Sequence, residues 1–193
     1  MAHPLETAYG LSATEILDAV ANRFRLRAAL EGAVAEVQAE RHIQALLGSI
    51  IVRYEGHDLD GQPDFSIWLP GRPEPLRIEC KNMRSTKAGV SVYRGGKRGG
   101  PILSYIVETQ KTRASKADPS SRFYGENQFE VLAVCIGKQT RDWSKMLFVR
   151  VEHLERHPQH QGKLAVFQRV PLPDSENLGS WYDDLGKLLS TYQ

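Results

Sequence analysis

The sequence predicts an α/β protein in which a mixed central β-sheet is flanked by helices on both faces. Helical signals dominate up to about Leu47, apolar residues then alternate in Asp64–Leu69 and Leu76–Asn82, and a nearly continuous apolar run covers Gln128–Ile136. Alternation is typical of half-buried strands, and a continuous run is typical of a central strand covered on both sides. The order helix, strands, helix, strand, strand predicts a mixed sheet between layers of helices.

Length and composition are those of one ordinary globular domain. The chain has 193 residues, of which 25% are charged and 41% hydrophobic. We expect N-terminal helices at 12–47, a core at about 50–151 and a C-terminal extension at 152–193. No apolar run approaches the roughly 20 residues that span a bilayer, and no signal peptide opens the sequence, so a cytoplasmic protein is expected.

The N-terminal region begins with a helix start signal. Ser12 and Glu15 have the spacing of a capping box, and the sequence that follows favours helix. A break near Asn22 or Gly32 would divide it into two helices. The first strand is expected at Ile50–Tyr54.

A β-hairpin is expected next. Apolar residues fall on every second position of Asp64–Leu69 and of Leu76–Lys81, so each strand turns one face to the core. Pro70–Pro75 is a breaker segment of the kind that joins antiparallel strands. At the open end of such a hairpin, Asp64 comes close to the segment Glu79–Lys81.

The second half of the sequence predicts one more helix, two strands and a terminal helix. Pro101 fits the first turn of a helix at about Ile102–Lys116. After the central strand, Lys145–Val151 is expected to be a strand. Trp181–Leu189 has the spacing of a short amphipathic helix that covers the core or a dimer partner.

The hairpin would bring together groups suited to metal chemistry. Two carboxylates a few ångströms apart, Asp64 and Glu79, repel each other unless a cation lies between them. Hard oxygen ligands favour Mg²⁺, and the backbone carbonyl of Cys80 is a further candidate ligand. A bound metal can orient and deprotonate an attacking water, while Lys81 assists the water or stabilises the charge that develops at phosphorus.

This arrangement resembles the PD-(D/E)XK nuclease superfamily, which has the restriction-endonuclease-like fold. Asp64 matches the first acid of the motif, Glu79 the second and Lys81 the lysine. The likeness extends over about residues 25–151, and its motifs are short. A solvent-facing Glu79/Lys81 pair on an edge strand is the alternative interpretation.

The resemblance implies further site residues and partners. Glu40 is similar in placement to the helix acid of related endonucleases, and Glu36, one turn earlier, is the rival candidate. The implied activity is Mg²⁺-dependent hydrolysis of double-stranded DNA by a site-specific, type II restriction enzyme, with Mn²⁺ as substitute metal. Cutting both strands favours a homodimer. The alternatives are a structure-specific nuclease, such as a junction resolvase or repair endonuclease, and a non-catalytic binding module.

Positive charge borders the proposed site although the net charge is only +2. Between Arg77 and Arg113 the acids are Glu79 and Glu108, whereas cations recur throughout. Such a stripe is expected to bind a phosphate backbone. The expected DNA contacts are Arg84, Lys87, Arg94, Lys97, Arg98, Lys111 and Arg113. A solvated basic surface loop is the alternative for the glycine-rich part, 94–100.

The cysteines and histidines suggest no zinc site. Cys80 and Cys135 lie in strand-like runs without zinc spacing, so buried free thiols are expected. His153, His157 and His160 cluster in the sequence, but a proline between the last two interrupts helical spacing.

Three other positions have two interpretations each. Ser120–Gly125 could contact a phosphate or stack on a base, and a turn packed by its two aromatic residues is the simpler interpretation. Gln110 could support the site or lie on a solvated face. His57 could bind metal or act as a base, and a loop histidine is the simpler interpretation.

Overall fold

The computed structural model describes residues 2–59, 61–86, 89–96, 99–111 and 115–192. The chain divides into two compact units, one ending at Val34 and the other beginning at Ala35. Each unit is considered by itself.

Helices form the first unit and continue into the second. They are α1 (Pro4–Tyr9), α2 (Ala13–Ala21) and α3 (Phe24–Gln44). The predicted capping box is confirmed, because Ser12 Oγ accepts a hydrogen bond from Glu15 N at 3.3 Å while the Glu15 carboxylate accepts one from Ser12 N at 2.8 Å. Helix α2 ends at Asn22, whereas α3 runs through Gly32. Of the two predicted break points, the first is therefore the right one.

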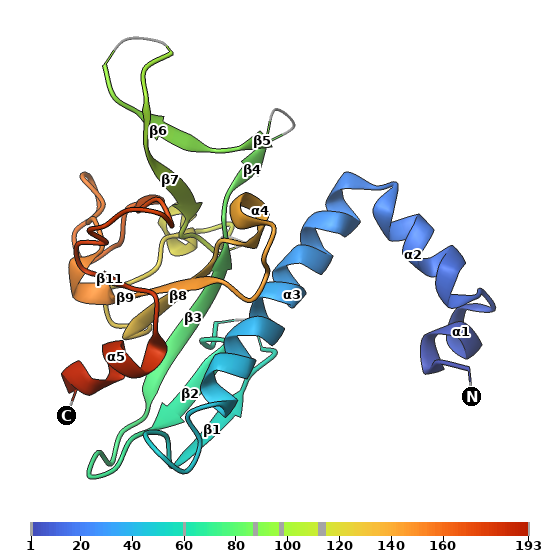
Figure 1. The fold of residues 1–193 in the computed structure, drawn as a ribbon, viewed down its shortest axis with the longest axis horizontal. Helices are drawn as coiled ribbons and strands as arrows, with labels where there is room; N and C mark the ends of the chain where they lie inside the picture. The colour runs from blue at the N-terminus through green and yellow to red at the C-terminus, as the bar shows by residue number, and fades with distance from the viewer. Residues whose placement is uncertain (1, 60, 87–88, 97–98, 112–114, 193) are drawn as a thin grey trace. The chain divides into compact units, whose positions relative to one another are not determined.

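A six-stranded mixed sheet forms the centre of the second unit, in the order β1-β2-β3-β8-β9-β11 (Figure 1). The strands are β1 (Arg53–Gly56), β2 (Phe65–Trp68), β3 (Leu76–Asn82), β8 (Val131–Cys135), β9 (Met146–Arg150) and β11 (Trp181–Tyr182). Strands β3 and β8 are parallel, and the other neighbours are antiparallel. The predicted mixed α/β class, the β2–β3 hairpin and the central position of β8 are thereby confirmed.

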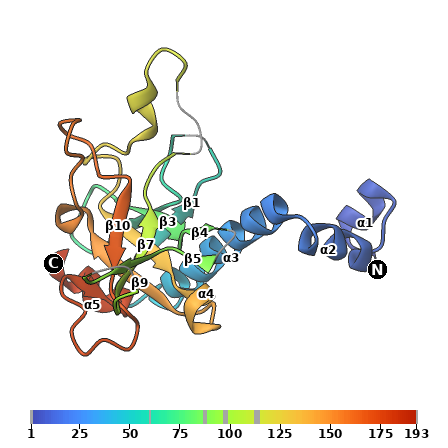
Figure 2. The same ribbon diagram turned by 90° about the horizontal axis from the view of Figure 1, so that it is seen from above.

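A smaller three-stranded sheet, in the order β10-β7-β6, covers part of the second face of the central sheet (Figure 2). Its strands are β6 (Val92–Arg94), β7 (Ile102–Glu108) and β10 (Phe167–Val170). A two-stranded ribbon, β4 (Ser85–Thr86) with β5 (Gly89–Val90), follows β3. The remaining short helices are η1 (Pro119–Arg122), α4 (Gly137–Thr140), η2 (Val151–His153), α5 (Leu185–Leu189) and η3 (Ser190–Tyr192).

The helix predicted at Ile102–Lys116 is wrong, since this segment contains strand β7. Its apolar positions fit a helix face, but Tyr105, Ile106 and Val107 are aromatic or β-branched and favour a strand. Strand β7 pairs antiparallel with β6, and Gly95 N donates to the carbonyl of Pro101 at 3.0 Å where the two strands meet. The second face of the central sheet is consequently covered by a sheet where a helix was expected.

Two other element boundaries differ from the prediction. The first strand begins at Arg53 because Ile51, inside the predicted range Ile50–Tyr54, is buried in the core before the strand starts. Near the C-terminus, Trp181–Tyr182 pair with β9, and α5 begins only after Asp184. The Asp184 carboxylate caps that helix by accepting a hydrogen bond from Lys187 N at 2.8 Å.

The core has two parts, one on each face of the central sheet. On one face, α3 and α5 cover the sheet, with Ala35, Ala39 and Ile43 of α3 fully buried against it. On the other face, Val107 of β7 and Val170 of β10 pack with alternate residues of β8 and β9. Strand β3 packs Leu76, Ile78 and Cys80 into the first of these layers, so Glu79 and Lys81 point to the opposite face. None of the described helices is long and apolar enough to cross a membrane.

Candidate active site

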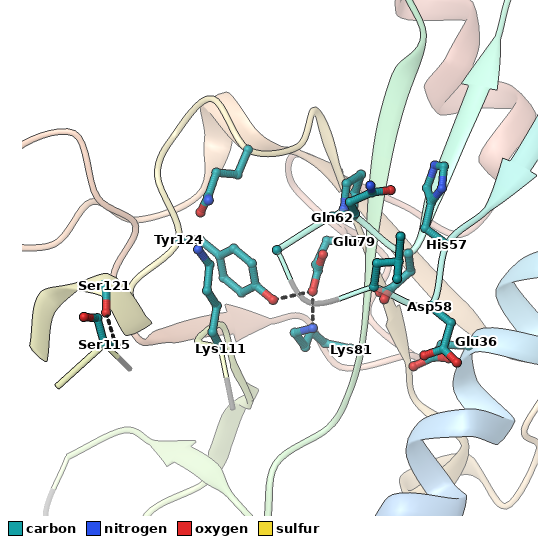
Figure 3. Close-up of a pocket in the computed structure, with 15 residues that line it drawn as sticks. Glu36, His57, Asp58, Gln62, Glu79, Lys81, Lys111, Ser115, Ser121 and Tyr124 are labelled. Carbon is teal, nitrogen blue, oxygen red and sulfur yellow. Dashed lines mark hydrogen bonds and ion pairs between the residues drawn. The ribbon is translucent and has the colours of Figure 1, made fainter. Parts of the chain in front are cut away.

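An open cleft of about 890 Å³ lies over the open end of the β2–β3 hairpin (Figure 3). One side is contributed by α3 and by the loop before β2, and the other by η1 and residues on either side of it. Its charged and hydrogen-bonding side chains are Glu36, His57, Asp58, Gln62, Asp64, Glu79, Lys81, Lys111, Ser115, Ser121, Tyr124 and Gln128. The three residues of the predicted motif therefore line one cleft.

The hairpin places Asp64 next to β3, as its register requires. Phe65 pairs with Ile78 in an antiparallel register, so Asp64 lies one residue beyond the paired region, level with Glu79 in the middle of β3. The Asp64 carboxylate accepts a hydrogen bond from Cys80 N at 2.6 Å. The acid at the start of one strand is thus fixed to the backbone of the other.

Glu79 and Lys81 form the centre of the site. Glu79 is buried, with 3% of its surface exposed, and a buried carboxylate needs donors. Lys81 Nζ and the hydroxyl of Tyr124 both donate to Glu79 Oε1. Lys81 Nζ also lies 3.1 Å from the carbonyl oxygen of Cys80, the predicted backbone ligand. One ammonium group thus reaches both the carboxylate and the carbonyl that a metal would share.

Negative charge is crowded in this cleft. Burial raises the pKa of Asp64 to about 7, and the charge of Glu79 acts in the same direction. Burial also raises the pKa of Glu36, although Lys81 opposes it. For Lys81, burial is the largest influence and lowers the pKa, but Glu79, Tyr124 and Asp64 together outweigh it and the pKa is raised. The site therefore keeps its lysine charged and favours a further cation.

The donor set suits Mg²⁺. Asp64, Glu79 and the carbonyl of Cys80 are hard oxygen ligands, and Mg²⁺ commonly takes one or two carboxylates and completes its shell with water and phosphate. No three His, Cys, Asp or Glu side chains among the described residues are grouped closely enough to hold a metal ion by themselves. A metal here would therefore depend on two carboxylates, backbone oxygen and water.

The helix acid of the cleft is Glu36, not Glu40. Glu36 lines the cleft, while the Glu40 carboxylate accepts a hydrogen bond from the hydroxyl of Tyr54 at 2.8 Å and lies outside the lining. Gln44 Nε2 also donates to Tyr54, at 2.8 Å. Of the two candidates named from the sequence, the rival is the one that lies in the cleft, because Glu40 is engaged with Tyr54 of β1.

The predicted basic residues are spread over different places. Lys111 lines the cleft. Arg84 Nε pairs with Glu108 at 3.0 Å, and Arg94 donates to the carbonyl of Gly100 at 2.9 Å; neither arginine lines the cleft. The other four predicted contacts lie outside the described residues: Lys87, Lys97, Arg98 and Arg113.

Several polar residues of the cleft were not predicted as members of the site. Tyr124 is the most important, because it reaches Glu79 from a segment for which a packed turn was the simpler interpretation. His57 also lines the cleft, with its Nε2 at 3.0 Å from Ser66 Oγ. No local motif marks either residue. The only sequence signal at Tyr124 is an aromatic pair next to a cation.

The thiol prediction is confirmed, since Cys80 and Cys135 are free and buried. Two of the three histidines that cluster in the sequence, His157 and His160, form a ring contact. The rings of His157 and His160 lie 4.6 Å apart, and Phe123 stacks on His157 at 4.5 Å. Gln110 donates to Glu108 and does not line the cleft.

Comparison with sequence families and with curated proteins gives no match. Among solved structures, the chain is similar to a bacterial homing endonuclease, I-Ssp6803I. The TM-score is 0.43 and the sequence identity 15%, over 78% of this chain and 82% of that chain.

Proposed function

We propose that this chain is a Mg²⁺-dependent DNA endonuclease of the PD-(D/E)XK type, which hydrolyses phosphodiester bonds as a site-specific, type II restriction enzyme. One observation carries the proposal. Asp64, Glu79 and Lys81, together with the helix acid Glu36, converge in a single open cleft. Two mutually repelling carboxylates beside a charged lysine have little structural use, but they suit a metal and a phosphate.

Asp64, Glu79 and the carbonyl of Cys80 would hold the metal. When bound, Mg²⁺ would lower the pKa of a water molecule and neutralise charge on the phosphate oxygens. The hydrogen bond from Cys80 N orients the Asp64 carboxylate, so that its second oxygen is available to a ligand. Glu36 adds a further carboxylate to the cleft and would orient a water molecule.

Lys81 supplies the positive charge of the site. Its ammonium is held by Glu79 and by the carbonyl of Cys80, within reach of whatever occupies the cleft. Since its pKa is raised, it stays protonated and donates hydrogen bonds instead of acting as a base. We assign Lys81 one of two roles: it positions the attacking water, or it stabilises the negative charge that develops at phosphorus.

DNA binding would extend from the cleft along the basic residues. Lys111 would contact a phosphate next to the scissile one, and the segment from Arg84 to Arg98 would hold the duplex farther away. A double-strand break requires two such sites, so two copies of this chain would act as a homodimer.

Cleavage of supercoiled plasmid and phage DNA, with Mg²⁺ or with EDTA, tests the proposal. Wild type, Asp64→Asn and Lys81→Met would be compared, with Glu40→Gln as a variant of an acid outside the cleft. We expect discrete Mg²⁺-dependent fragments that both site variants lose and Glu40→Gln retains. The proposal fails if Asp64→Asn cleaves like wild type.

Other outcomes would assign a different function. Nicking alone, or cleavage confined to four-way junctions, would identify a structure-specific nuclease. Salt-sensitive binding without cleavage of any duplex, junction or single strand would identify a binding module.

A further inference from the structure

Tyr124 occupies a fixed position between the second core layer and the cleft. Only 8% of its surface is exposed, and its ring lies edge-on to Phe129 at 5.3 Å. Its carbonyl oxygen accepts a hydrogen bond from Leu164 N at 2.9 Å. Ring and backbone are thus held by groups that have no part in the cleft, so the place of the hydroxyl is set by the core.

The hydroxyl of Tyr124 donates a hydrogen bond to the carboxylate of Glu79. It donates to Oε1, the same oxygen that receives Lys81 Nζ (Figure 3). Both hydrogen bonds that described residues make to this carboxylate end on Oε1, which leaves Oε2 for a ligand. Two donors from different segments fix a side chain far better than one, because neither can move without leaving a buried charge underbonded.

The ring of Tyr124 also lies near both lysines of the cleft. Lys81 Nζ is 5.4 Å and Lys111 Nζ is 5.8 Å from its centroid. Ammonium groups within about 6 Å of an aromatic ring are attracted by its negative face. One side chain therefore contacts the acid through its hydroxyl and both cations through its ring.

We propose that Tyr124 is the positioning residue of this site: its hydroxyl fixes the Glu79 carboxylate with one oxygen toward the metal, and its ring keeps Lys81 and Lys111 beside the phosphate. This inference rests on the proposed nuclease function, since it assigns a role within the same cleft. The two contributions are separable, because Tyr124→Phe removes the hydroxyl alone and Tyr124→Leu removes hydroxyl and ring.

A matched control exists in the same fold. Tyr54 also donates its hydroxyl to a glutamate, Glu40, outside the cleft lining. Tyr54→Phe thus deletes the same kind of hydrogen bond at a place where the proposal expects no effect on the site. Unfolding midpoints of all variants would show whether the fold is retained.

The first measurement compares metal-free crystal structures and Mn²⁺ binding. In the crystal structure of Tyr124→Phe we expect the Glu79 carboxylate to adopt a changed orientation or more than one orientation. We expect the Mn²⁺ dissociation constant to rise about tenfold, as for other losses of a hydrogen bond that supports a metal ligand. Tyr54→Phe should change neither. An unmoved Glu79 together with an unchanged dissociation constant in Tyr124→Phe would overturn the assignment.

The second measurement follows binding of a short DNA duplex in EDTA, where the metal plays no part. Tyr124→Phe should bind like wild type, and Tyr124→Leu should bind several-fold more weakly because the lysines lose the ring. Equal binding by both variants would overturn the role of the ring. If wild type neither binds Mn²⁺ nor cleaves DNA while Glu79 still moves in Tyr124→Phe, the nuclease proposal fails and the positioning of Glu79 stands.

Discussion

Asp64 accepts a hydrogen bond from the backbone N–H of Cys80, at 2.6 Å, across the open end of the β2–β3 hairpin. A side chain from the residue just before β2 is thereby attached to the residue of β3 that lies between Glu79 and Lys81. The contact joins the motif into one unit before any ligand is present. The Asp64 carboxylate is nevertheless buried and close to the negative charge of Glu79. The stability of the protein should therefore depend on whether Asp64 is ionised.

Asp64→Asn should stabilise the metal-free protein at neutral pH. The pKa of Asp64 is raised from 3.8 to about 7, first by burial and then by Glu79, so folding takes up a proton between those values and wild-type stability falls as pH rises through that window. The gain has an upper limit of about 4 kcal/mol above pH 7 and vanishes below about pH 4. Urea unfolding in EDTA across this range measures it, and a gain that persists at pH 3.5 would contradict the explanation.

Divalent ions should stabilise wild type and not the ligand variants. A metal that binds only the folded chain raises the free energy of unfolding by about 2.7 kcal/mol at a hundredfold excess over its dissociation constant. Thermal unfolding with Mn²⁺ or Mg²⁺ should therefore show an increase in Tm for wild type and for Glu40→Gln. Asp64→Asn and Glu79→Gln should show little increase. An equal increase in all four proteins would place the metal elsewhere.

Neutralising the two helix acids should have unequal effects on cleavage. Glu36→Gln should lower the initial rate by about ten- to a hundredfold, the range typical of groups that support a metal site. Glu40→Gln should stay within about twofold of wild type, since that carboxylate pairs with Tyr54 outside the cleft. Initial rates at saturating Mg²⁺ measure both, and the reverse order would restore Glu40 as the helix acid.

Lys111→Met should weaken DNA binding in a salt-dependent way. Loss of one phosphate contact lowers the slope of log affinity against log salt concentration by about one. Lys187→Met is the control, because Lys187 is an exposed lysine of α5 that pairs with Asp183 at 3.5 Å. Titrations at several salt concentrations with a catalytically inactive background, Asp64→Asn, provide the slopes. Identical slopes for both lysine variants would remove Lys111 from the DNA contact.

Two glycine substitutions should change stability in opposite directions. A Cβ on Gly137 would lie 2.7 Å from the Cα of Trp143, so Gly137→Ala should destabilise the fold by about 1 to 3 kcal/mol. A Cβ on Gly32 meets nothing within 4 Å, and Gly32→Ala inside helix α3 should stabilise that helix by up to about 1 kcal/mol. Chemical denaturation measures the first, and helix content by circular dichroism measures the second.

The parts of the site that the sequence predicted are those that local periodicity determines. Alternation over Leu76–Asn82 defines both ends of β3, and a hairpin then brings Asp64 to it without further information. The helix acid was ambiguous for a local reason as well. Glu36 and Glu40 lie one turn apart on the same helix, and the choice between them depends on where Tyr54 of β1 lies.

The parts that the sequence did not predict depend on distant contacts. Tyr124 reaches Glu79 across 45 residues of sequence, and no spacing rule connects them. Strand β7 was mistaken for a helix because its apolar residues satisfy both periods over so short a run. The segment forms a strand because it pairs with β10, which follows about 60 residues later in the sequence.

The central place of β3 bears on how the protein fluctuates. Its neighbours β2 and β8 pair with it on both edges, and Leu76, Ile78 and Cys80 are buried in the core on one of its faces. Amide hydrogen exchange at Cys80 should then be slow, because Cys80 lies in a strand that is paired on both edges. Glu79 and Lys81 belong to this strand and should therefore keep their places when other parts of the protein open locally.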